Sequence, residues 1–240
     1  MMGKCTAIVL SAGKGKRMGA DRAKQYLDLC GRPVLYYCLK AFQDSFIDDI
    51  VIVASVDDFD YIREEIVNKY KITKVTGIVE GGAERYDSVL AGLHAVGSSE
   101  GNAGNSYVFI HDGARPFVDE EMLTRAYETV KKYGTAITAV PSKDTVKIVN
   151  NEGITLDTPD RNTVWLMQTP QVFAYEPILE AYEKMHRYME ALPRMSTITD
   201  DAMVMEKFGD LPVHVCEGSY RNIKITTPED MKVAEAFLNR

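Results

Sequence analysis

The stretch that decides the fold lies close to the start of the chain, where residues 7–19 read AIVLSAGKGKRMG. The apolar run Ala7–Leu10 predicts a buried strand, and the glycine-rich stretch after it predicts a tight loop whose N–H groups can approach a ligand. Lys14, Lys16 and Arg17 add three positive charges to this loop. Such a loop is suited to hold phosphate, most plausibly that of a nucleoside triphosphate.

The loop differs from two better-known phosphate-binding loops. Both the Walker A pattern and the dinucleotide fingerprint require a glycine five residues after Gly13, and that position is Met18. The acidic residue that the dinucleotide fingerprint also needs is missing from residues 30–33. A purely structural turn is the remaining alternative, but such a turn does not need three cations within four residues.

Outward from this loop, strand-like and helix-like segments alternate. Ile50–Ala54 and Tyr107–Ile110 are apolar runs typical of buried parallel strands. Tyr86–Leu93 has apolar residues at helical spacing, a proline opens the helix expected at Pro33–Leu39, and Thr227 caps a helix that continues to the end. This alternation predicts one α/β domain over residues 1–240, with a mostly parallel twisted sheet flanked by helices.

One region interrupts the alternation. After the strand-like run Ala136–Pro141, apolar residues alternate on both sides of the turn Asn150–Gly153. The pattern predicts a β-hairpin arm at about residues 137–160. Because an isolated hairpin is only marginally stable in water, we expect the arm to pack against a partner subunit.

Composition limits the class of protein. The chain has 240 residues, 45% hydrophobic and 26% charged, which is ordinary for a soluble globular domain. Its net charge of −7 argues against a nucleic-acid surface, and no apolar run is long enough for a membrane span. The chain shows no secretory leader, and its four cysteines are scattered, so a cytoplasmic protein is expected.

Two segments expected at the carboxyl edge of the sheet carry candidate ligands. Residues 81–85 (GGAER) offer free N–H groups and Arg85 for an anion, or form a plain turn. Asp112 follows a buried strand and can hold Mg²⁺, or it can pair with Arg115 within its loop. His111 is expected to be a packed histidine rather than an acid or a ligand.

Three later segments are less specific. Arg161 can grip a phosphate bidentately or lie on the surface, and Thr199 and the two aspartates after it are typical of a helix start. Residues 222–226 (NIKIT) are expected to form the last strand, from which Lys224 can reach the active edge. No pairing of a nucleophile with a base stands out. A reaction between two phosphates needs no such pair, because the attacking oxygen is already ionised. Catalysis then depends on positioning the reactants and on cations around the α-phosphorus.

Taken together, these motifs resemble the nucleotidyltransferases that make activated sugars and alcohols. The pattern is most similar to the 2-C-methyl-D-erythritol 4-phosphate cytidylyltransferase family of the non-mevalonate isoprenoid pathway, and it covers nearly the whole chain in order. The segments that carry the resemblance are residues 12–18 (AGKGKRM), 24–26 (KQY), 81–89 (GGAERYDSV), 111–116 (HDGARP), 143–145 (KDT), 160–161 (DR), 168–171 (QTPQ), 199–202 (TDDA) and 222–226 (NIKIT).

The resemblance implies a GT-A-like, Rossmann-type fold and transfer of CMP from CTP to a polyol phosphate, with Mg²⁺ and release of pyrophosphate. Arg17 and Lys24 match positions that stabilise charge on the α-phosphate, and Arg161 and Lys224 match positions that orient the acceptor phosphate. The arm would form a homodimer and bring its own residues to the partner's site. The remaining candidates are Ala12, Gly13, Gly15, Gly82, Arg85 and Ser88 for the nucleotide, Arg115, Thr145 and Thr199 for the acceptor, and Asp112 for the metal.

Two alternatives stay open. Ribitol 5-phosphate cytidylyltransferases share the fold and the chemistry, and small polyol phosphates differ by few contacts. A non-catalytic nucleotide-binding protein could also keep the fold, although the joint presence of Arg17, Lys24, Asp112 and Lys224 argues against it. Ala83 departs from the family, whose members often carry an acid there, so a base or ribose contact could be looser.

Overall fold

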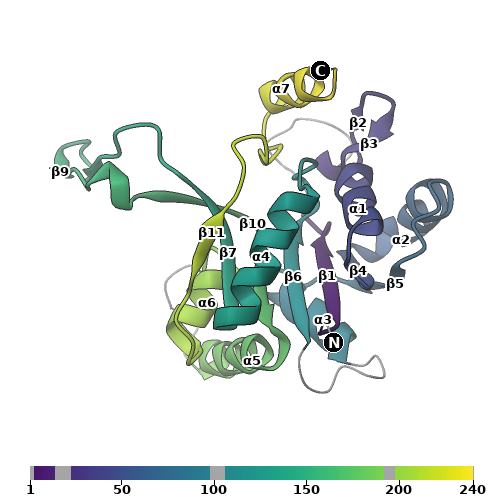
Figure 1. Cartoon of the computed structure of the whole chain (residues 1–240), viewed down its shortest axis with the longest axis horizontal. Coiled ribbons are helices and arrows are strands. Elements are labelled where there is room, and N and C mark those ends of the chain that lie inside the picture. Colours follow the sequence, from purple (N-terminus) through teal and green to yellow (C-terminus); the bar gives the residue numbers. More distant parts are fainter. Residues whose placement is uncertain (1–2, 14–22, 98–105, 192–197, 240) are drawn as a thin grey trace.

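A seven-stranded sheet forms the centre of the computed structural model, which describes residues 3–13, 23–97, 106–191 and 198–239 (Figure 1). The strand order is β11-β7-β10-β6-β1-β4-β5. Strand β10 runs antiparallel to both of its neighbours, and the other pairs are parallel, so the predicted mostly parallel sheet is confirmed. The strands are β1 (Cys5–Leu10), β4 (Asp49–Ala54), β5 (Val75–Glu80), β6 (Tyr107–Asp112), β7 (Thr135–Pro141), β10 (Trp165–Ala174) and β11 (Val215–Glu217).

Helices cover both faces of this sheet. Helices α1 (Val34–Asp44) and α4 (Glu120–Tyr133) and the π-helical segment η4 (Ile62–Asn68) pack on one face. Helices α3 (Arg85–Gly97), α5 (Tyr175–Ala191) and α6 (Asp201–Phe208) pack on the other. The central strands therefore bury both faces, which explains their continuous apolar sequences. The short helical turns η2 (Lys24–Tyr26), η3 (Val56–Asp58) and α2 (Phe59–Tyr61) connect these layers.

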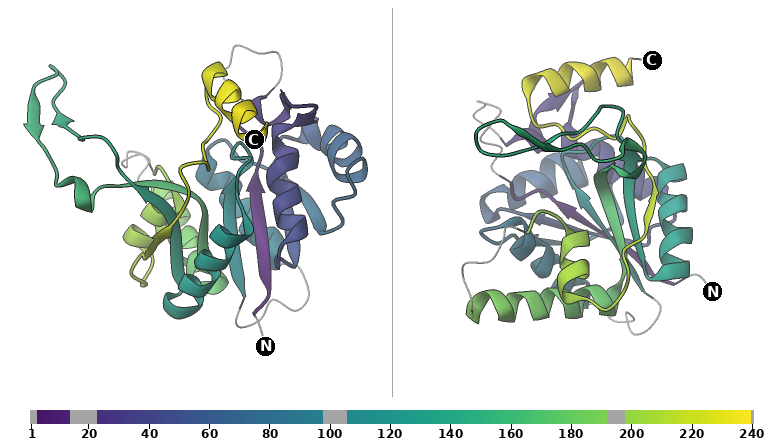
Figure 2. Two further views of the ribbon diagram at one scale, coloured as in Figure 1. Left: turned by 45° about the horizontal axis from the view of Figure 1, so that its top comes forward. Right: turned by 90° about the vertical axis from the view of Figure 1, so that its left-hand side faces the viewer.

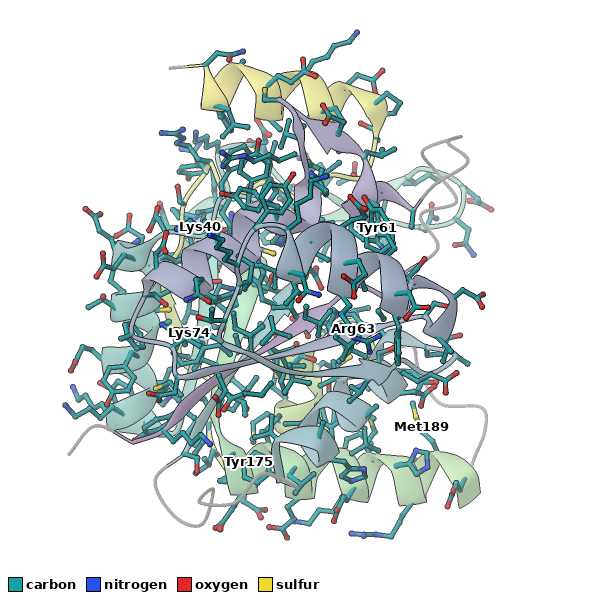
Figure 3. All side chains as sticks on the ribbon, turned by 90° about the vertical axis from the view of Figure 1, so that its right-hand side faces the viewer. Lys40, Tyr61, Arg63, Lys74, Tyr175 and Met189 are labelled. Carbon is teal, nitrogen blue, oxygen red and sulfur yellow. The ribbon has the colours of Figure 1, made fainter. Side chains whose placement is uncertain are left out.

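Close packing brings the middle of α3 against the sheet. A Cβ atom at Gly92 would lie 2.5 Å from Cγ2 of Ile8, so only glycine lets α3 approach β1 this closely. The outer surface of the α1 and η4 layer is polar. Lys40 and Arg63, labelled in Figure 3, form exposed ion pairs with Asp44 and Asp60.

Sequence signals set several helix boundaries. Asp119 accepts a hydrogen bond from the Met122 N–H at 2.8 Å and caps α4, which ends at Gly134 with φ 78°. Thr227 and Asp230 form a capping box at the start of α7 (Pro228–Leu238), as predicted. The strands expected at residues 50–54 and 107–110 and the helices expected at residues 33–39 and 86–93 are also confirmed.

The expectation of a last strand at residues 222–226 is wrong. The segment makes no strand ladder: the Ile223 N–H bonds locally to the Arg221 carbonyl, and the Ile225 N–H bonds to the Ala114 carbonyl at 2.9 Å. The segment therefore lies against the loop that follows β6. Its alternating pattern arises because Ile225 is buried in a separate cluster under α7, with Leu29 of the small hairpin β2 (Asp28–Leu29) and β3 (Arg32–Pro33).

The predicted hairpin arm projects from the body of the molecule (Figures 1 and 2). It carries β8 (Ile148–Val149), β9 (Thr155–Asp157) and the turn η5 (Arg161–Thr163). The chain leaves the central sheet after Pro141, the last residue of β7, and rejoins it at Trp165. Ile148, Ile154 and Leu156 are 48%, 58% and 66% exposed, which is unusual for side chains of this type and leaves an apolar surface on the arm.

Within the described ranges, no helix combines the length and the apolar character that crossing a bilayer requires.

Candidate active site

Three loops meet at the carboxyl edge of the sheet, where ligands bind in folds of this kind. They follow β1, β5 and β6, and they enclose a cavity of about 240 Å³. The residues that line it are Leu10, Ala12, Gly13, Lys24, Gln25, Gly82, Ala83, Glu84, Arg85, Ser88, Asp112, Ala114 and Lys224. Eight residues that the sequence singled out as candidates are thus brought together: Ala12, Gly13, Lys24, Gly82, Arg85, Ser88, Asp112 and Lys224.

The loop after β1 is braced by the residues next to Lys24. The side-chain amide of buried Gln25 donates to the Ser11 carbonyl at 2.5 Å and to the Gly13 carbonyl at 3.2 Å. The Tyr26 hydroxyl donates to Asp58 at 3.1 Å and accepts from the Ser11 hydroxyl at 3.2 Å. Gln25 and Tyr26 are therefore tied to the start of the loop after β1, and Lys24 precedes them in η2.

The loop after β5 packs directly on the loop after β1. A Cβ atom at Gly81 would lie 2.6 Å from Cβ of Ala12 and 2.8 Å from Oγ of Ser88, so only glycine fits. The Ser88 hydroxyl accepts from the Gly82 N–H at 3.1 Å and donates to the Glu84 carbonyl at 3.2 Å. The start of α3 is thereby fixed at the cavity wall, with its N-terminal turn beside the glycine pair.

Asp112 is the electrostatic centre of the cavity. Its carboxylate lies 2.7 Å from Nζ of Lys224, 3.4 Å from Nε of Arg85 and 4.0 Å from Nε of Arg115, and its side chain is 11% exposed. Burial alone would raise the pKa of Asp112, but the three cations outweigh it and hold the pKa far below its usual range. Asp112 is therefore ionised. Arg85 also pairs with the buried carboxylate of Asp201, so the three cations exceed these two carboxylates by one charge. This excess is available to a polyanion.

The pairing of Asp112 with Arg115 is present, but it is one contact among three. Arg115 also donates from Nη1 to the Asn222 carbonyl at 2.6 Å, which ties the loop after β6 to the segment that carries Lys224. Asn222 is fully buried and donates from Nδ2 to the Thr169 carbonyl at 2.8 Å. Lys224 thus reaches Asp112 from an irregular segment that side-chain bonds hold in place, not from a strand.

His111 is the packed histidine that the sequence predicts. It is fully buried, with Nε2 3.0 Å from the Arg115 carbonyl and Nδ1 3.2 Å from the Thr169 hydroxyl. Burial lowers its pKa to about 4, so the ring is neutral near pH 7. The Thr169 hydroxyl also accepts a hydrogen bond from the Asp112 N–H at 3.0 Å. This bond holds the backbone of Asp112 in place.

The remaining candidates lie elsewhere. Arg161 and Thr145 are exposed and belong to the arm, where Nη1 of Arg161 lies 3.4 Å from the Lys143 carbonyl. Thr199 is exposed just before α6 and does not line the cavity. Gly15 and Arg17 lie outside the described residues.

The cavity also depends on a residue that the sequence pointed to only as part of a helix start. Asp201 is fully buried and holds both terminal nitrogens of Arg85, at 2.7 and 2.8 Å. The two residues are 116 positions apart, so no local pattern pairs them. The sequence signal for this residue was that two aspartates stand together at the helix start. One N-cap is enough for α6, and Asp200 supplies it, so the second aspartate is not needed as a cap.

The donor set at the cavity fits a metal ion that arrives with a nucleotide. Among the described residues, no three His, Cys, Asp or Glu side chains form a cluster that could hold a metal by themselves. Mg²⁺ commonly takes one or two carboxylates and completes its shell with phosphate oxygens and water. Asp112, ionised and at the cavity wall, matches that single carboxylate.

Comparison with known proteins gives a consistent family. The family model described as 2-C-methyl-D-erythritol 4-phosphate cytidylyltransferase matches residues 5–240. A protein of that name from Lachnoclostridium phytofermentans is 47% identical, over 99% of this chain and 97% of its own length. Another from Clostridium novyi is 45% identical, over 99% and 97% of the two chains.

Solved structures agree in fold. A 4-diphosphocytidyl-2C-methyl-D-erythritol synthase from Anaerococcus prevotii superposes with a TM-score of 0.82 at 35% identity, covering 99% of this chain and 97% of that one. The 2-C-methyl-D-erythritol 4-phosphate cytidylyltransferase of Francisella tularensis gives 0.77 at 30% identity, covering 97% and 99%. The fold, the cavity and the full-length matches agree, and the chain belongs to the 2-C-methyl-D-erythritol 4-phosphate cytidylyltransferase family.

Proposed function

We propose that this protein transfers CMP from CTP to 2-C-methyl-D-erythritol 4-phosphate. A phosphate oxygen of the acceptor attacks the α-phosphorus of CTP, the bond from that phosphorus to the bridging oxygen breaks, and pyrophosphate leaves with the electron pair. The products are the CDP-alcohol and pyrophosphate. The observation that carries this proposal is the surplus of positive charge around Asp112 at the carboxyl edge of the sheet.

The cavity residues divide into two roles in this mechanism. Lys24, the first residue of η2, lines the cavity and neutralises charge that develops on the α-phosphate, and Arg17 is assigned the same role. Lys224, which is paired with Asp112, orients the acceptor phosphate. Because both reactants are anions, bringing them together is the main barrier, and fixed cations lower it.

The nucleotide lies against the two glycine loops in this proposal. Ala12, Gly13, Gly82 and Ser88 line the cavity, where small residues let the ligand approach the backbone. Mg²⁺ bound to the triphosphate would neutralise charge and increase the electrophilicity of the α-phosphorus, with one oxygen of Asp112 among its ligands.

We further propose a homodimer in which the arms complete the sites. Arg161 and Thr145 lie on the projecting arm, so they can serve a cavity only on another subunit if the family roles hold. The exposed apolar side chains of β8 and β9 give the arm a surface that a second copy would cover. Arg161 would then grip the acceptor phosphate bidentately across the subunit boundary. A cytoplasmic location accords with four cysteines that are all free thiols.

The experiment that tests this function pairs each nucleoside triphosphate with several polyol phosphates and measures pyrophosphate release. We expect release with CTP and methylerythritol 4-phosphate and its loss with EDTA. Preference for ribitol 5-phosphate would assign a different acceptor to the same chemistry. CTP binding without pyrophosphate from any acceptor would show a binding protein instead.

A further inference from the structure

Arg85 is held from behind by a carboxylate that the mechanism above does not use. Its Nη1 and Nη2 donate to the two oxygens of Asp201 at 2.7 and 2.8 Å, in a bidentate pair. The Tyr182 hydroxyl donates to the same carboxylate at 2.5 Å. Asp201 and Tyr182 are both fully buried, whereas the Arg85 side chain is 28% exposed at the cavity wall.

Asp201 is not needed to begin its helix. Asp200 is the N-cap of α6, where its carboxylate accepts from the Met203 N–H at 3.0 Å. Gln171 supports that turn by donating to Asp200 at 2.9 Å and accepting from the Ala202 N–H at 2.8 Å. Burying a second carboxylate here is costly unless donors compensate it, and Arg85 and Tyr182 supply them. The Arg85–Asp201 pair therefore positions the Arg85 side chain and is not needed for the helix to begin.

The pair determines what Arg85 can offer to the cavity. With both terminal nitrogens bonded to Asp201, the guanidinium meets Asp112 through Nε, at 3.4 Å. One cation lies between two carboxylates, so Asp201 cancels the charge of Arg85. The positive surplus that faces a triphosphate then comes from Lys24 and Lys224 at the cavity wall.

We propose that Asp201 is a positioning residue for the transfer reaction: it locks Arg85 against Asp112 and keeps the guanidinium from moving onto the phosphates of the nucleotide. Asp112 is thereby held in the one orientation that can contact both the metal and Lys224. This inference rests on the proposed function and deepens it. Tyr182 acts one step further back by fixing the carboxylate of Asp201.

The test removes the negative charge of Asp201 and keeps the size and shape of its side chain. In Asp201→Asn, the amide can no longer hold both guanidinium nitrogens, so Arg85 is released and its charge is unmasked. We expect kcat to fall about tenfold to a hundredfold because the aligned groups lose their positions. Metal-free CTP, titrated into EDTA-treated protein by calorimetry, should bind about threefold to tenfold more tightly because one positive charge is added to the cavity.

Matched variants separate this effect from damage to the helix. Asp200→Asn removes the same charge from the same turn, keeps a good N-cap and touches no atom of Arg85. It should leave kcat and metal-free CTP affinity within about twofold. Tyr182→Phe removes one hydroxyl, and it should lower kcat about twofold to fivefold and raise CTP affinity in the same direction as Asp201→Asn. It serves as the second test if Asp201→Asn does not fold.

Several results would overturn the proposal. One is an Asp201→Asn enzyme with the kcat of the wild type. Another is a loss of kcat with metal-free CTP affinity unchanged or weaker, which is the signature of a distorted site. A third is an equal loss in Asp200→Asn. The proposed function fails separately, if the wild type releases no pyrophosphate, while the metal-free titration still measures whether Asp201 masks Arg85.

Discussion

The cavity and the arm carry cations in opposite ways. At the cavity, Lys224, Arg85 and Arg115 surround one buried carboxylate, and every partner comes from the same chain. On the arm, Arg161 is exposed, and its guanidinium contacts only the Lys143 carbonyl among the described residues. A cation that is paired with a carboxylate of its own chain is held in position before the substrate arrives. An exposed cation is held in position only once a partner subunit or a ligand contacts it. If the proposed dimer holds, the difference teaches that one subunit builds the nucleotide side of the site and that a second subunit completes the acceptor side.

The largest effect is expected at the cavity. Lys24→Ala should lower kcat by about a thousandfold, because it removes a fixed positive charge from the α-phosphate in the transition state. Steady-state pyrophosphate release measures it. Lys40→Ala on α1, an exposed lysine paired with Asp44, is the control and should retain full activity. Near-normal turnover of Lys24→Ala would contradict the role assigned to Lys24 at the α-phosphate. It would also contradict the claim that the cavity supplies the cations of the nucleotide side.

The arm residue should affect the acceptor instead. Arg161→Ala is expected to raise KM for the polyol phosphate about a hundredfold with KM for CTP unchanged, since in the proposed dimer Arg161 contacts only the acceptor. Arg63→Ala, an exposed arginine paired with Asp60, is the matched control. An effect confined to CTP would contradict this division of labour.

Mixing the two impaired variants, assayed with the acceptor far below the raised KM of Arg161→Ala, sharpens the comparison further. A dimer of one Lys24→Ala chain and one Arg161→Ala chain would contain one site with an intact cavity and an intact arm. Activity should reappear at about a quarter of the wild-type level after subunit exchange, since about half of the dimers are mixed and each has one good site. No recovery in a verified heterodimer would show that each subunit uses its own arm.

Buried His111 predicts a dependence of stability on pH. Its folded pKa is depressed to about 4, below the unfolded value of about 6.5, so the neutral form is favoured on folding. The stabilisation is complete above pH 6.5 and is lost as pH falls from 6.5 to 4, amounting to about 3 kcal/mol. Urea unfolding at pH 7 and pH 4.5 measures it. His111→Asn should flatten this slope, and an unchanged slope would mean that another group is responsible.

A substitution on the apolar surface of the arm should have the smallest effect on the activity of each site. Leu156→Asp places a charge on β9, where the side chain is 66% exposed in the single chain, and should weaken the dimer about tenfold by sedimentation. Activity would then fall mainly on dilution. Val56→Asp, at a side chain that is 52% exposed on η3, is the control. A dimer unaffected by Leu156→Asp would place the interface elsewhere.

Local patterns predicted the sheet, most helices and the hairpin. Strands buried on both faces appear as continuous apolar runs, and elements buried on one face repeat apolar residues at a characteristic period. These patterns also predicted the edge at which the cavity forms, since Asp112 ends β6 and Gly82 lies two residues after the end of β5. They failed where contacts are distant in sequence. The period-two pattern around Lys224 reflects burial under α7, not a strand, and the Arg85–Asp201 pair joins residues 116 positions apart. Ion pairing of that kind leaves no periodic trace.

The most direct test is a crystal structure with Mg²⁺ and a CTP analogue that cannot release pyrophosphate. The account predicts the α-phosphate within hydrogen-bond distance of Nζ of Lys24, and Asp112 beside the metal with its hold on Arg85 intact. Triphosphate density away from the cavity lined by Lys24, Asp112 and Lys224 would contradict it.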